Sequence, residues 1–447
     1  MSDRNNPSLL ARILKSVAGV EPHEVSAVLL SMVYFFFLFG SYSVVKPVRD
    51  AMGTVYGIKH LNELFIGTFI GTLILAPLYA GLASRIKLSN FLPWVYGFIA
   101  LTILGFYALF SGGKVSDRYV AAGFYIWVSV FNMLIISVFW SFMADIFSRT
   151  QAKRLFGFIA AGGTVGGIAG PAIATFLAKG VGNDGLMLIS AAGFVVTGVL
   201  VKLLAGARDR LVAASGNEGQ RTNINHRLGG RNPLDGFILL LKSPYLLLIA
   251  GFLFLMTFIS TIVYTQLGDL ITKAFTDHNA RTQAYATIEL AVNSLAVVIQ
   301  LIGTGRIIQR FGVTLGLMLN PVIMVFAFLA IAFSPVLMIL GGLQVVRRVA
   351  EYAVAKPTRE MLFTVVDQES KYKAKNVIDT VVYRGGDMLA AQATVGVLNG
   401  FGDVGLAILG IIVSLIWFPM AWILGRRYES ARSTDGLKTA AVPAAGH

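Results

Sequence analysis

Runs of about 20 apolar residues recur along the whole chain, which is the length a helix needs to cross the hydrocarbon core of a bilayer. The short alternating segments that an outer-membrane barrel requires do not stand out. The pattern therefore predicts an all-α polytopic membrane protein with twelve transmembrane helices. Their expected ranges are 24–47, 60–82, 90–111, 117–145, 153–178, 185–205, 235–268, 281–303, 312–333, 335–366, 374–399 and 403–425.

One long polar stretch divides these helices into two groups of six. Residues 206–236 are rich in Arg, Asn and Gly, a composition typical of a flexible linker. We expect an N-terminal six-helix bundle over 1–205, a cytoplasmic linker over 206–236 and a C-terminal six-helix bundle over 237–427. The remaining segment, 428–447, is expected to be disordered.

The composition agrees with a membrane protein and excludes other classes. Apolar residues make up 56% of the chain and charged residues only 13%, against about a quarter in soluble proteins. The net charge of +14 does not indicate nucleic-acid binding, because Lys and Arg gather in alternate loops, as the positive-inside rule requires. Both termini are therefore expected in the cytoplasm. The chain has no Cys, which excludes disulfides and thiolate metal sites.

Two segments repeat at a nearly constant spacing. DIFSRTQAK, from Asp145, aligns with DQESKYKAK, from Asp367, and SRI, with Arg85, aligns with GRI, with Arg306. Two parallel six-helix halves joined by a cytoplasmic linker resemble the layout of the major facilitator superfamily. That layout implies a substrate site between the halves, whose rocking alternates its access.

The repeated loops predict an ion-paired cytoplasmic gate. Asp145 and Asp367 are expected to pair with Arg85, Arg306 or neighbouring cations in the outward-facing state. The alternative is that these are ordinary helix-end charges set by topology. The candidate gate residues are Arg85, Asp145, Arg149, Lys153, Arg306, Asp367, Lys371 and Lys375.

Several predicted spans carry charges, each of which costs about 2.5–3.5 kcal/mol on insertion scales and so needs a reason. The cations among them exceed the acids by three, counting Lys46, Arg49, Arg347, Arg348, Lys356, Arg359 and Arg384 against Asp50, Glu351, Glu360 and Asp387. This excess indicates an anionic substrate. The candidate substrate-binding residues are Lys46, Arg49, Asp50, Asn132, Arg347, Arg348, Glu351, Lys356, Arg384 and Asp387.

A purely structural explanation of these charges stays open. Arg347 with Glu351 and Lys356 with Glu360 are i,i+4 neighbours, and Arg384 with Asp387 is an i,i+3 pair, so the charges can hold helices together without touching a ligand. A titratable carboxylate inside a span is also compatible with proton coupling. The candidates for that role are Glu289, Glu351 and Asp387.

A glycine motif lies on predicted helix 5. Gly162, Gly166 and Gly170 recur every four residues, a spacing that lets two helices approach closely. The segment GGIAGP also resembles the GxxxGP antiporter motif of the superfamily, which favours exchange over symport.

Three segments resemble the ATP/ADP antiporter family, the nucleotide transporters of plastids and obligate intracellular bacteria. They are EYAVAKPTREMLFTVVDQESKYKAKNVIDTVVYRGGDM on helices 10 and 11, VFWSFMADIFSRTQAKRLFGFIAAGG on helices 4 and 5, and YSVVKPVRDAM on helix 1. The chain is identified as a divergent bacterial member of that family. The resemblance implies a twelve-helix nucleotide exchanger in which Arg49, at the position of a family Lys, and Arg384 contact phosphates.

The chain departs from the family at three places. WVSVFNML on helix 4 lacks an acidic residue, FISTIVYTQLGDL on helix 7 lacks a Glu and a Lys, and Asp387 falls about where the family has a Lys. Fewer cations and one more acid argue against a triphosphate. The resemblance therefore supports the scaffold more strongly than the cargo.

We expect a secondary transporter in a bacterial inner membrane, with a small anionic solute and the lipid bilayer as partners. The first hypothesis is an antiporter of nucleotides or related phosphorylated solutes, and the alternative is a proton-coupled transporter of another organic anion. A third is a non-transporting membrane receptor or lipid-binding protein. No His and carboxylate cluster with metal spacing and no ATPase motif occurs, so we expect no enzyme, metal or cofactor. We expect a monomer.

Overall fold

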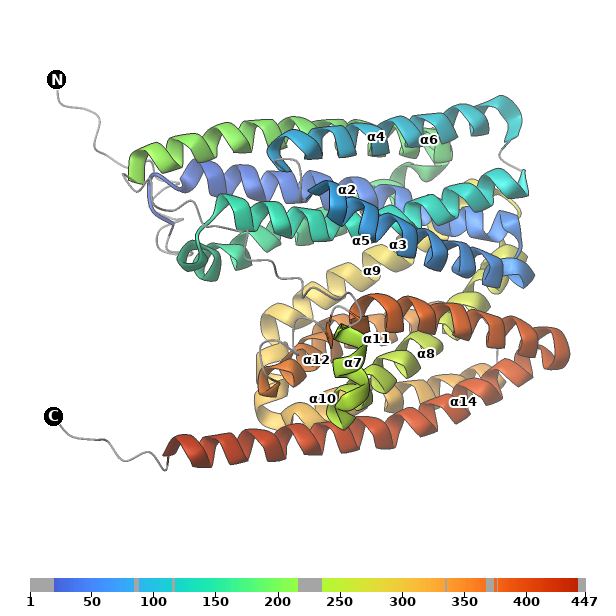
Figure 1. The fold of residues 1–447 in the computed structure, drawn as a ribbon. Helices are drawn as coiled ribbons and strands as arrows, with labels where there is room; N and C mark the ends of the chain where they lie inside the picture. Colours follow the sequence, from blue (N-terminus) through green and yellow to red (C-terminus); the bar gives the residue numbers. More distant parts are fainter. Residues whose placement is uncertain are drawn as a thin grey trace, which may run out of the picture. The chain divides into compact units, whose positions relative to one another are not determined.

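The computed structural model describes residues 20–83, 88–114, 117–215, 235–333, 336–366, 374–375 and 377–440, and every regular element in these ranges is a helix. Nine of the described helices are long and apolar enough to cross a membrane. The elements are drawn in Figure 1. The α-helices are α2 (Val25–Tyr56), α3 (Leu61–Ala83), α4 (Leu88–Leu109), α5 (Arg118–Ile146), α6 (Arg149–Ser215), α7 (Asp235–Lys242), α8 (Pro244–Ala274), α9 (His278–Ile302), α10 (Thr304–Phe333), α11 (Leu337–Ala350), α12 (Lys356–Leu362) and α14 (Tyr383–Ala440). Short turns of 3-10 helix are η1 (Ile58–His60) and η5 (Phe363–Val365), and turns of π-helix are η2 (Phe110–Lys114), η4 (Glu351–Ala355) and η6 (Ile378–Val382).

The described helices agree with the twelve expected spans once two long helices are divided. Helix α6 breaks at Gly182, with φ 68°, and α14 breaks at Gly402, with φ 63°. Positive φ is readily adopted only by glycine, so each break is a turn between two spans. Helices α11 and α12 together form a single span, which the π-turn η4 interrupts.

Several boundaries differ from the sequence-based expectation, such as the end of α2 at Tyr56 and the start of α10 at Thr304. The seventh span divides into α7 and α8 at Ser243, because Pro244 has no amide hydrogen to continue the helix. Helix α14 continues to Ala440, so the expected disorder of 428–447 is corrected for residues 428–440. Residues 428–440, YESARSTDGLKTA, contain several strong helix formers.

The chain divides into two compact units. Unit 1 contains residues 1–56, 70–226 and 275–290, and unit 2 contains 57–69, 227–274 and 291–447. The predicted bundles follow chain order and so miss two exchanged segments. The first part of α9 is held in unit 1 by side-chain contacts to α2 and α6, and residues 57–69 are held in unit 2 by contacts such as Asn62 Nδ2 donating to Gln392 Oε1 at 3.0 Å.

The glycine face of α6 packs on the backbone of α2 in unit 1. A Cβ atom on Gly166 would lie 2.5 Å from the carbonyl oxygen of Phe36, and one on Gly170 would lie 2.7 Å from that of Gly40. The close helix approach expected from the glycine spacing is therefore present. Next to it, Phe35 stacks on Phe139 with ring centroids 4.0 Å apart.

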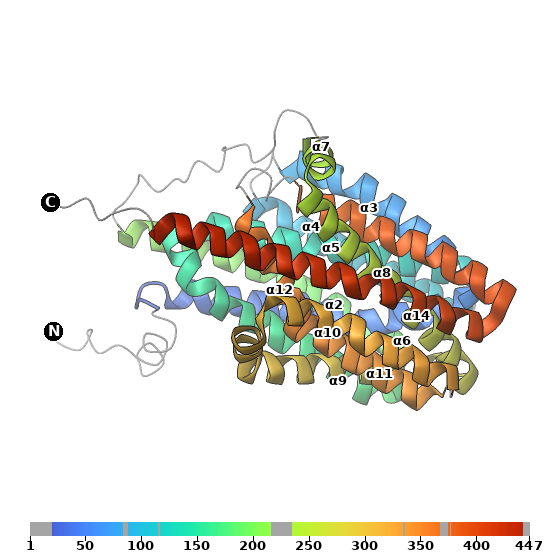
Figure 2. The ribbon, with the colours of Figure 1, turned by 90° about the horizontal axis from the view of Figure 1, so that it is seen from below.

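In unit 2, α8 and α10 both lie along α14 (Figure 1, Figure 2). The ring of Phe252 on α8 contacts that of Trp417 on α14, with centroids 5.4 Å apart. Large apolar side chains such as Phe176, Leu301 and Met338 are exposed on helices, with exposed fractions of 76%, 82% and 86%. Such exposure suits a surface covered by lipid acyl chains.

Candidate functional site

A buried ion pair joins α2 to the first part of α9 in unit 1. Lys46 Nζ lies 2.7 Å from Glu289 Oε2, and the Glu289 side chain is only 8% exposed. Neither charge is stable alone in an apolar interior, so each compensates the other. Lys46 and Glu289 were both candidates from sequence, for different roles, and the structure brings them together.

Arg49, one turn further along α2, contacts an acid, a hydroxyl group and an aromatic ring. Its Nε donates to Asp50 Oδ1 at 3.0 Å, its Nη1 donates to Ser129 Oγ on α5 at 3.1 Å, and its Nη2 also contacts Asp50. The guanidinium lies over the ring of Tyr125, with 5.0 Å between Cζ and the ring centroid. These contacts hold the planar group in one orientation, as recognition of a carboxylate or phosphate requires.

Two buried tyrosines lie beside these charges. Tyr42 is within electrostatic range of Lys46, Arg49, Asp50 and Glu289. Tyr285, four residues before Glu289 on α9, is within range of Asp50 and Arg49. We call Lys46, Arg49, Asp50 and Glu289 the unit 1 centre.

A second buried ion pair lies on α11 and η4 in unit 2. Arg347 Nη1 is 2.9 Å from Glu351 Oε2, and the arginine side chain is only 6% exposed. The same nitrogen donates to Ser260 Oγ on α8 at 2.7 Å, and Nε donates to Gln344 Oε1 at 3.1 Å. The expected i,i+4 pair is therefore present, and it also attaches α11 to α8.

Two further arginines complete this cluster. Arg348 Nη2 donates to the Tyr352 hydroxyl at 2.8 Å, and its guanidinium lies over the ring of the same residue. Arg384 Nη1 lies 3.5 Å from Asp387 Oδ2, as the i,i+3 spacing predicts, and Thr261 Oγ1 on α8 donates to Asp387 Oδ1 at 3.4 Å. We call Arg347, Arg348, Glu351, Arg384 and Asp387 the unit 2 centre.

Two π-turns lie at the unit 2 centre. Glu351 begins η4, and η6 ends at Val382, two residues before Arg384. Pro357 has no amide hydrogen for the carbonyl of Ala353, which instead accepts from Thr304 Oγ1 at 2.6 Å. Such π-turns are frequent at functional sites, because they redirect side chains within a helix.

A separate group of charges lies further along the same helices. Arg359 Nη2 is 3.6 Å from Asp379 Oδ1, and Lys375 Nζ is 2.5 Å from Glu360 Oε2. Lys356 is exposed and acts electrostatically on Asp379. The expected pairing of Lys356 with Glu360 is corrected here, because Lys375 and Arg359 contact that carboxylate instead.

The charge balance expected from sequence changes accordingly. Glu289 compensates the charge of Lys46, and Asp379 compensates that of Arg359. Neither acid was included when the sequence analysis counted acids against cations. Adding these two acids, together with Lys375, which contacts the already counted Glu360, lowers the positive excess from three to two. Chain order could not show this, because each acid lies on a different helix from the cation it contacts.

Some buried polar groups of the described residues have no hydrogen-bond partner. Asn132 on α5 buries its Oδ1 and Gln266 on α8 buries its Oε1 with no partner among the described residues. A buried acceptor without a donor is costly, and a bound ligand can supply that donor. Asn132 was a candidate from sequence, whereas Gln266 was not.

The gate residues are only partly described. Arg85, Asp367 and Lys371 lie outside the described residues, as do the side chains of Arg149 and Lys153. Asp145 interacts electrostatically with Arg208 of α6, and Arg306 Nη1 donates to the carbonyl of Ile302 at 3.3 Å. Lys375 contacts Glu360, as given above. The gate thus stays a prediction.

A carboxylate missed by the sequence analysis lies at the start of α2. Glu24 is 1% exposed, and its Oε1 accepts from Arg154 at 2.7 Å and from Gln151 at 2.8 Å. Gln151 in turn accepts from the backbone of Ser148, whose hydroxyl caps α6. The spacing Ser-x-x-Gln was the available signal.

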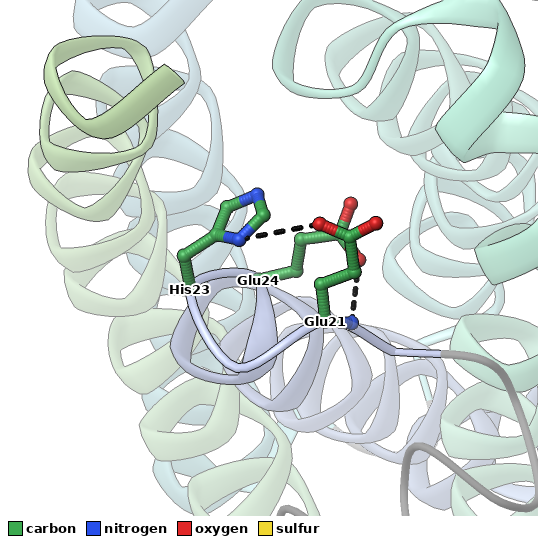
Figure 3. A group of neighbouring side chains, drawn as sticks. All are labelled: Glu21, His23 and Glu24. Carbon is green, nitrogen blue, oxygen red and sulfur yellow. Dashed lines mark hydrogen bonds and ion pairs between the residues drawn. The ribbon is translucent and has the colours of Figure 1, made fainter. Parts of the chain in front are cut away.

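Figure 3 shows Glu24 with its neighbours Glu21 and His23. Their potential ligand atoms lie within 4.8 Å of one another. However, Glu24 Oε2 accepts a hydrogen bond from the backbone amide of Glu21 at 2.9 Å, and Oε1 accepts from Gln151 and Arg154 on α6. The group therefore acts as a helix-end contact that joins α2 to α6.

We expect Glu24→Ala to lower the free energy of unfolding by about 1–3 kcal/mol, because it leaves the Arg154 guanidinium and the Gln151 amide without their acceptor. Glu21→Ala is the matched control, since that side chain is exposed and three residues away. Thermal unfolding in detergent measures both. An equal effect of the two variants would contradict the assigned role of Glu24.

Long apolar helices that bury ion-paired arginines define a class of protein, the polytopic membrane transporters. The model of the Major Facilitator Superfamily matches residues 25–346, and the chain belongs to this superfamily. It is therefore a transporter and not an enzyme, as the sequence predicts, and the receptor hypothesis is set aside.

Known relatives agree with this family. The chain is 22% identical over 485 residues to ADP,ATP carrier protein 1 of Chlamydia pneumoniae, covering 92% of each chain. It is 23% identical over 397 residues to ADP,ATP carrier protein 1 of Chlamydia muridarum, covering 80% of this chain and 73% of the relative. In fold it resembles a bacterial homologue of the iron transporter ferroportin in the inward-facing state. The TM-score is 0.60 at 13% identity, over 89% of this chain and 98% of that chain.

Proposed function

We propose that this transporter exchanges nucleotides or related phosphorylated anionic solutes by alternating access. The observation that carries the proposal is that each unit holds a mostly buried arginine, Arg49 or Arg347, which hydrogen bonds to a neighbouring helix fix in orientation. Guanidinium groups held in this way suit bidentate binding of phosphate oxygens. The similarity to ADP,ATP carriers over most of the chain supports a nucleotide cargo.

The proposed substrate contacts come from the two centres, except Glu289, and from Asn132 on α5. In unit 1 they are Lys46, Arg49, Asp50 and Asn132, and in unit 2 they are Arg347, Arg348, Glu351, Arg384 and Asp387. Lys356 belongs to the proposal as a more peripheral cation. We place the protein in a bacterial cytoplasmic membrane as a monomer, with both termini inside, because basic residues gather on that side.

The proposed gate keeps its members from both repeats. Asp145, Arg149 and Lys153 in one repeat correspond to Asp367, Lys371 and Lys375 in the other. Contact of Lys375 with Glu360 supports an ion-paired element at this end of unit 2.

One observation favours a second candidate, proton-coupled transport of another organic anion. The Lys46–Glu289 pair is buried, and protonation of Glu289 would release Lys46 to an anionic ligand. Glu351 and Asp387 offer comparable carboxylates in unit 2. In this case a pH gradient, and not an internal nucleotide, would drive accumulation.

Proteoliposomes separate the two candidates. Vesicles loaded with AMP, ADP or ATP are supplied with the same labelled nucleotide outside, next to empty vesicles with and without an imposed pH gradient. We expect uptake at least tenfold faster into loaded vesicles, because an exchanger reorients only with substrate bound. Equal uptake into empty vesicles that depends on the pH gradient would replace exchange by proton coupling.

A further inference from the structure

Asn132 on α5 of unit 1 holds a hydrogen-bond acceptor that has no donor. Its side chain is half-buried, and its Oδ1 is buried with no partner among the described residues. Such an acceptor costs free energy unless a water or a ligand supplies the missing hydrogen bond. The amide is therefore placed to contact a molecule that enters unit 1.

The amide shares a face of α5 with the residues that orient Arg49. Tyr125 and Ser129 come seven and three residues before Asn132, and this spacing places all three on one side of the helix. Arg49 Nη1 donates to Ser129 Oγ at 3.1 Å, and the guanidinium lies over the Tyr125 ring. Asn132 thus lies on the same face as the contacts of the arginine that we propose for phosphate binding.

The register of α2 against α5 sets the level of Asn132 within unit 1. Arg49 on α2 contacts Ser129 on α5. Tyr42, seven residues earlier on α2, has its ring centroid 6.3 Å from that of Phe131, two residues later on α5. The two helices therefore run antiparallel, and Asn132 lies near the level of Tyr42. Along the helix axis it is three residues, or about 4.5 Å, from Ser129.

A phosphate group alone does not satisfy this amide. A carboxamide has an acceptor, Oδ1, beside a donor, Nδ2. An ionised phosphate offers only acceptor oxygens, so it can meet the donor but not the acceptor. The missing partner must offer a hydrogen-bond donor, and a part of the cargo other than its phosphate has to supply it.

Two vicinal hydroxyl groups of a sugar have the matching chemistry. Each hydroxyl both donates and accepts, so one can donate to Oδ1 while its neighbour accepts from Nδ2. The amino edge of a base such as adenine offers a similar pair. In a nucleotide, however, the sugar connects the base to the phosphate, so the sugar hydroxyls lie nearer to the phosphate. Asn132 is less than one helical turn from the residue that Arg49 contacts, and this short spacing favours the sugar.

We propose that Asn132 binds vicinal hydroxyl groups of the sugar that carries the phosphate, while Arg49 binds the phosphate itself. This inference rests on the proposed function and deepens it, because it names the second chemical group that unit 1 recognises. A site built to hydrogen-bond a substrate hydroxyl rejects the analogue that lacks it, so ribonucleotides should bind at least tenfold more tightly than their 2′-deoxy forms.

Paired probes test the proposal on the purified full-length protein. AMP, ADP and ATP are each compared with their 2′-deoxy and 3′-deoxy forms. ADP is also compared with IDP, which changes only the amino edge of the base. Ribose 5-phosphate and 2-deoxyribose 5-phosphate form a pair without any base. Thermal stabilisation reports binding, and counterflow in proteoliposomes reports transport.

A variant without the amide tests the role of Asn132. Asn132→Leu removes the donor and the acceptor at similar size, and we expect it to lose the preference for the ribonucleotide, so that the ribo and deoxy forms bind equally. Asn90→Leu is the matched control, because Asn90 is exposed on α4 outside the unit 1 centre. The control should keep the full preference. Asn132→Ala provides a second variant if Asn132→Leu does not fold.

The outcomes distinguish this inference from the proposed function. Nucleotide exchange with equal affinity for ribo and deoxy forms, or a preference that the folded Asn132 variant retains, would overturn the sugar contact and leave nucleotide exchange standing. Discrimination of ADP from IDP alone, lost in the variant, would assign the amide to the base and so also overturn the sugar contact. A preference for ribose 5-phosphate over its deoxy form, without binding of any nucleotide, would uphold the sugar contact and refute the nucleotide cargo. Binding of none of the probes would refute both.

Discussion

Arg49→Lys and Arg384→Lys should each lower nucleotide exchange by about 10- to 100-fold while leaving the protein folded. A hydrogen bond to a charged group contributes about 1.5–3 kcal/mol, which corresponds to that range. Lysine keeps the charge but loses the planar fork that grips two oxygens. At Arg49 it also loses the geometry that reaches Asp50 and Ser129 together. Initial rates of counterflow in proteoliposomes measure the effect.

The control for this prediction is Arg426→Lys, since Arg426 is exposed on α14 and lies outside both centres. That variant should exchange at the normal rate. Gel filtration and thermal unfolding show whether each variant is folded. If both Arg49→Lys and Arg384→Lys bind substrate as tightly as the parent protein, the anion-binding assignment fails, and helix packing explains these charges.

Neutralising Arg347 should destabilise the protein by about 3–5 kcal/mol, the range for breaking a buried ion pair from one side. Arg347→Gln leaves the Glu351 carboxylate without its cation inside unit 2, and it removes the donor to Ser260 on α8. The double variant Arg347→Gln with Glu351→Gln should recover much of the loss, because no isolated charge then remains. Thermal unfolding in detergent gives the comparison.

An exposed pair of the same spacing provides the control. Lys273 is 61% exposed and pairs with Asp269 at i,i+4, so Lys273→Gln should cost about 1 kcal/mol or less. A double variant as unstable as Arg347→Gln alone would show that the pair does not act as a unit. Equal costs at Arg347 and Lys273 would show that burial does not matter here.

Local spacing was enough to predict several contacts. The four-residue repeat of Gly162, Gly166 and Gly170 indicated a close helix approach, and α2 occupies that face. The i,i+4 spacing of Arg347 and Glu351 indicated a pair on one side of a helix, and the structure has it at 2.9 Å. Such contacts depend only on the helical repeat, which the apolar pattern already established.

Contacts between distant helices were not predictable in the same way. Lys46 and Glu289 are far apart in the chain, and nothing in the spacing of either residue names the other. The same holds for Glu24 with Arg154, and for Ser129, whose hydroxyl helps to orient Arg49. A single buried hydroxyl in an apolar helix gives no periodic signal.

The sequence by itself determined the class of this protein and the course of its helices, because the bilayer imposes a length and an apolar composition that are readable residue by residue. It also determined which charges needed an explanation, since charge is rare in such helices. Only the tertiary structure decided how those charges are compensated. Pairing depends on which helices become neighbours, so the ion pairs of the two centres could be read only from the folded chain.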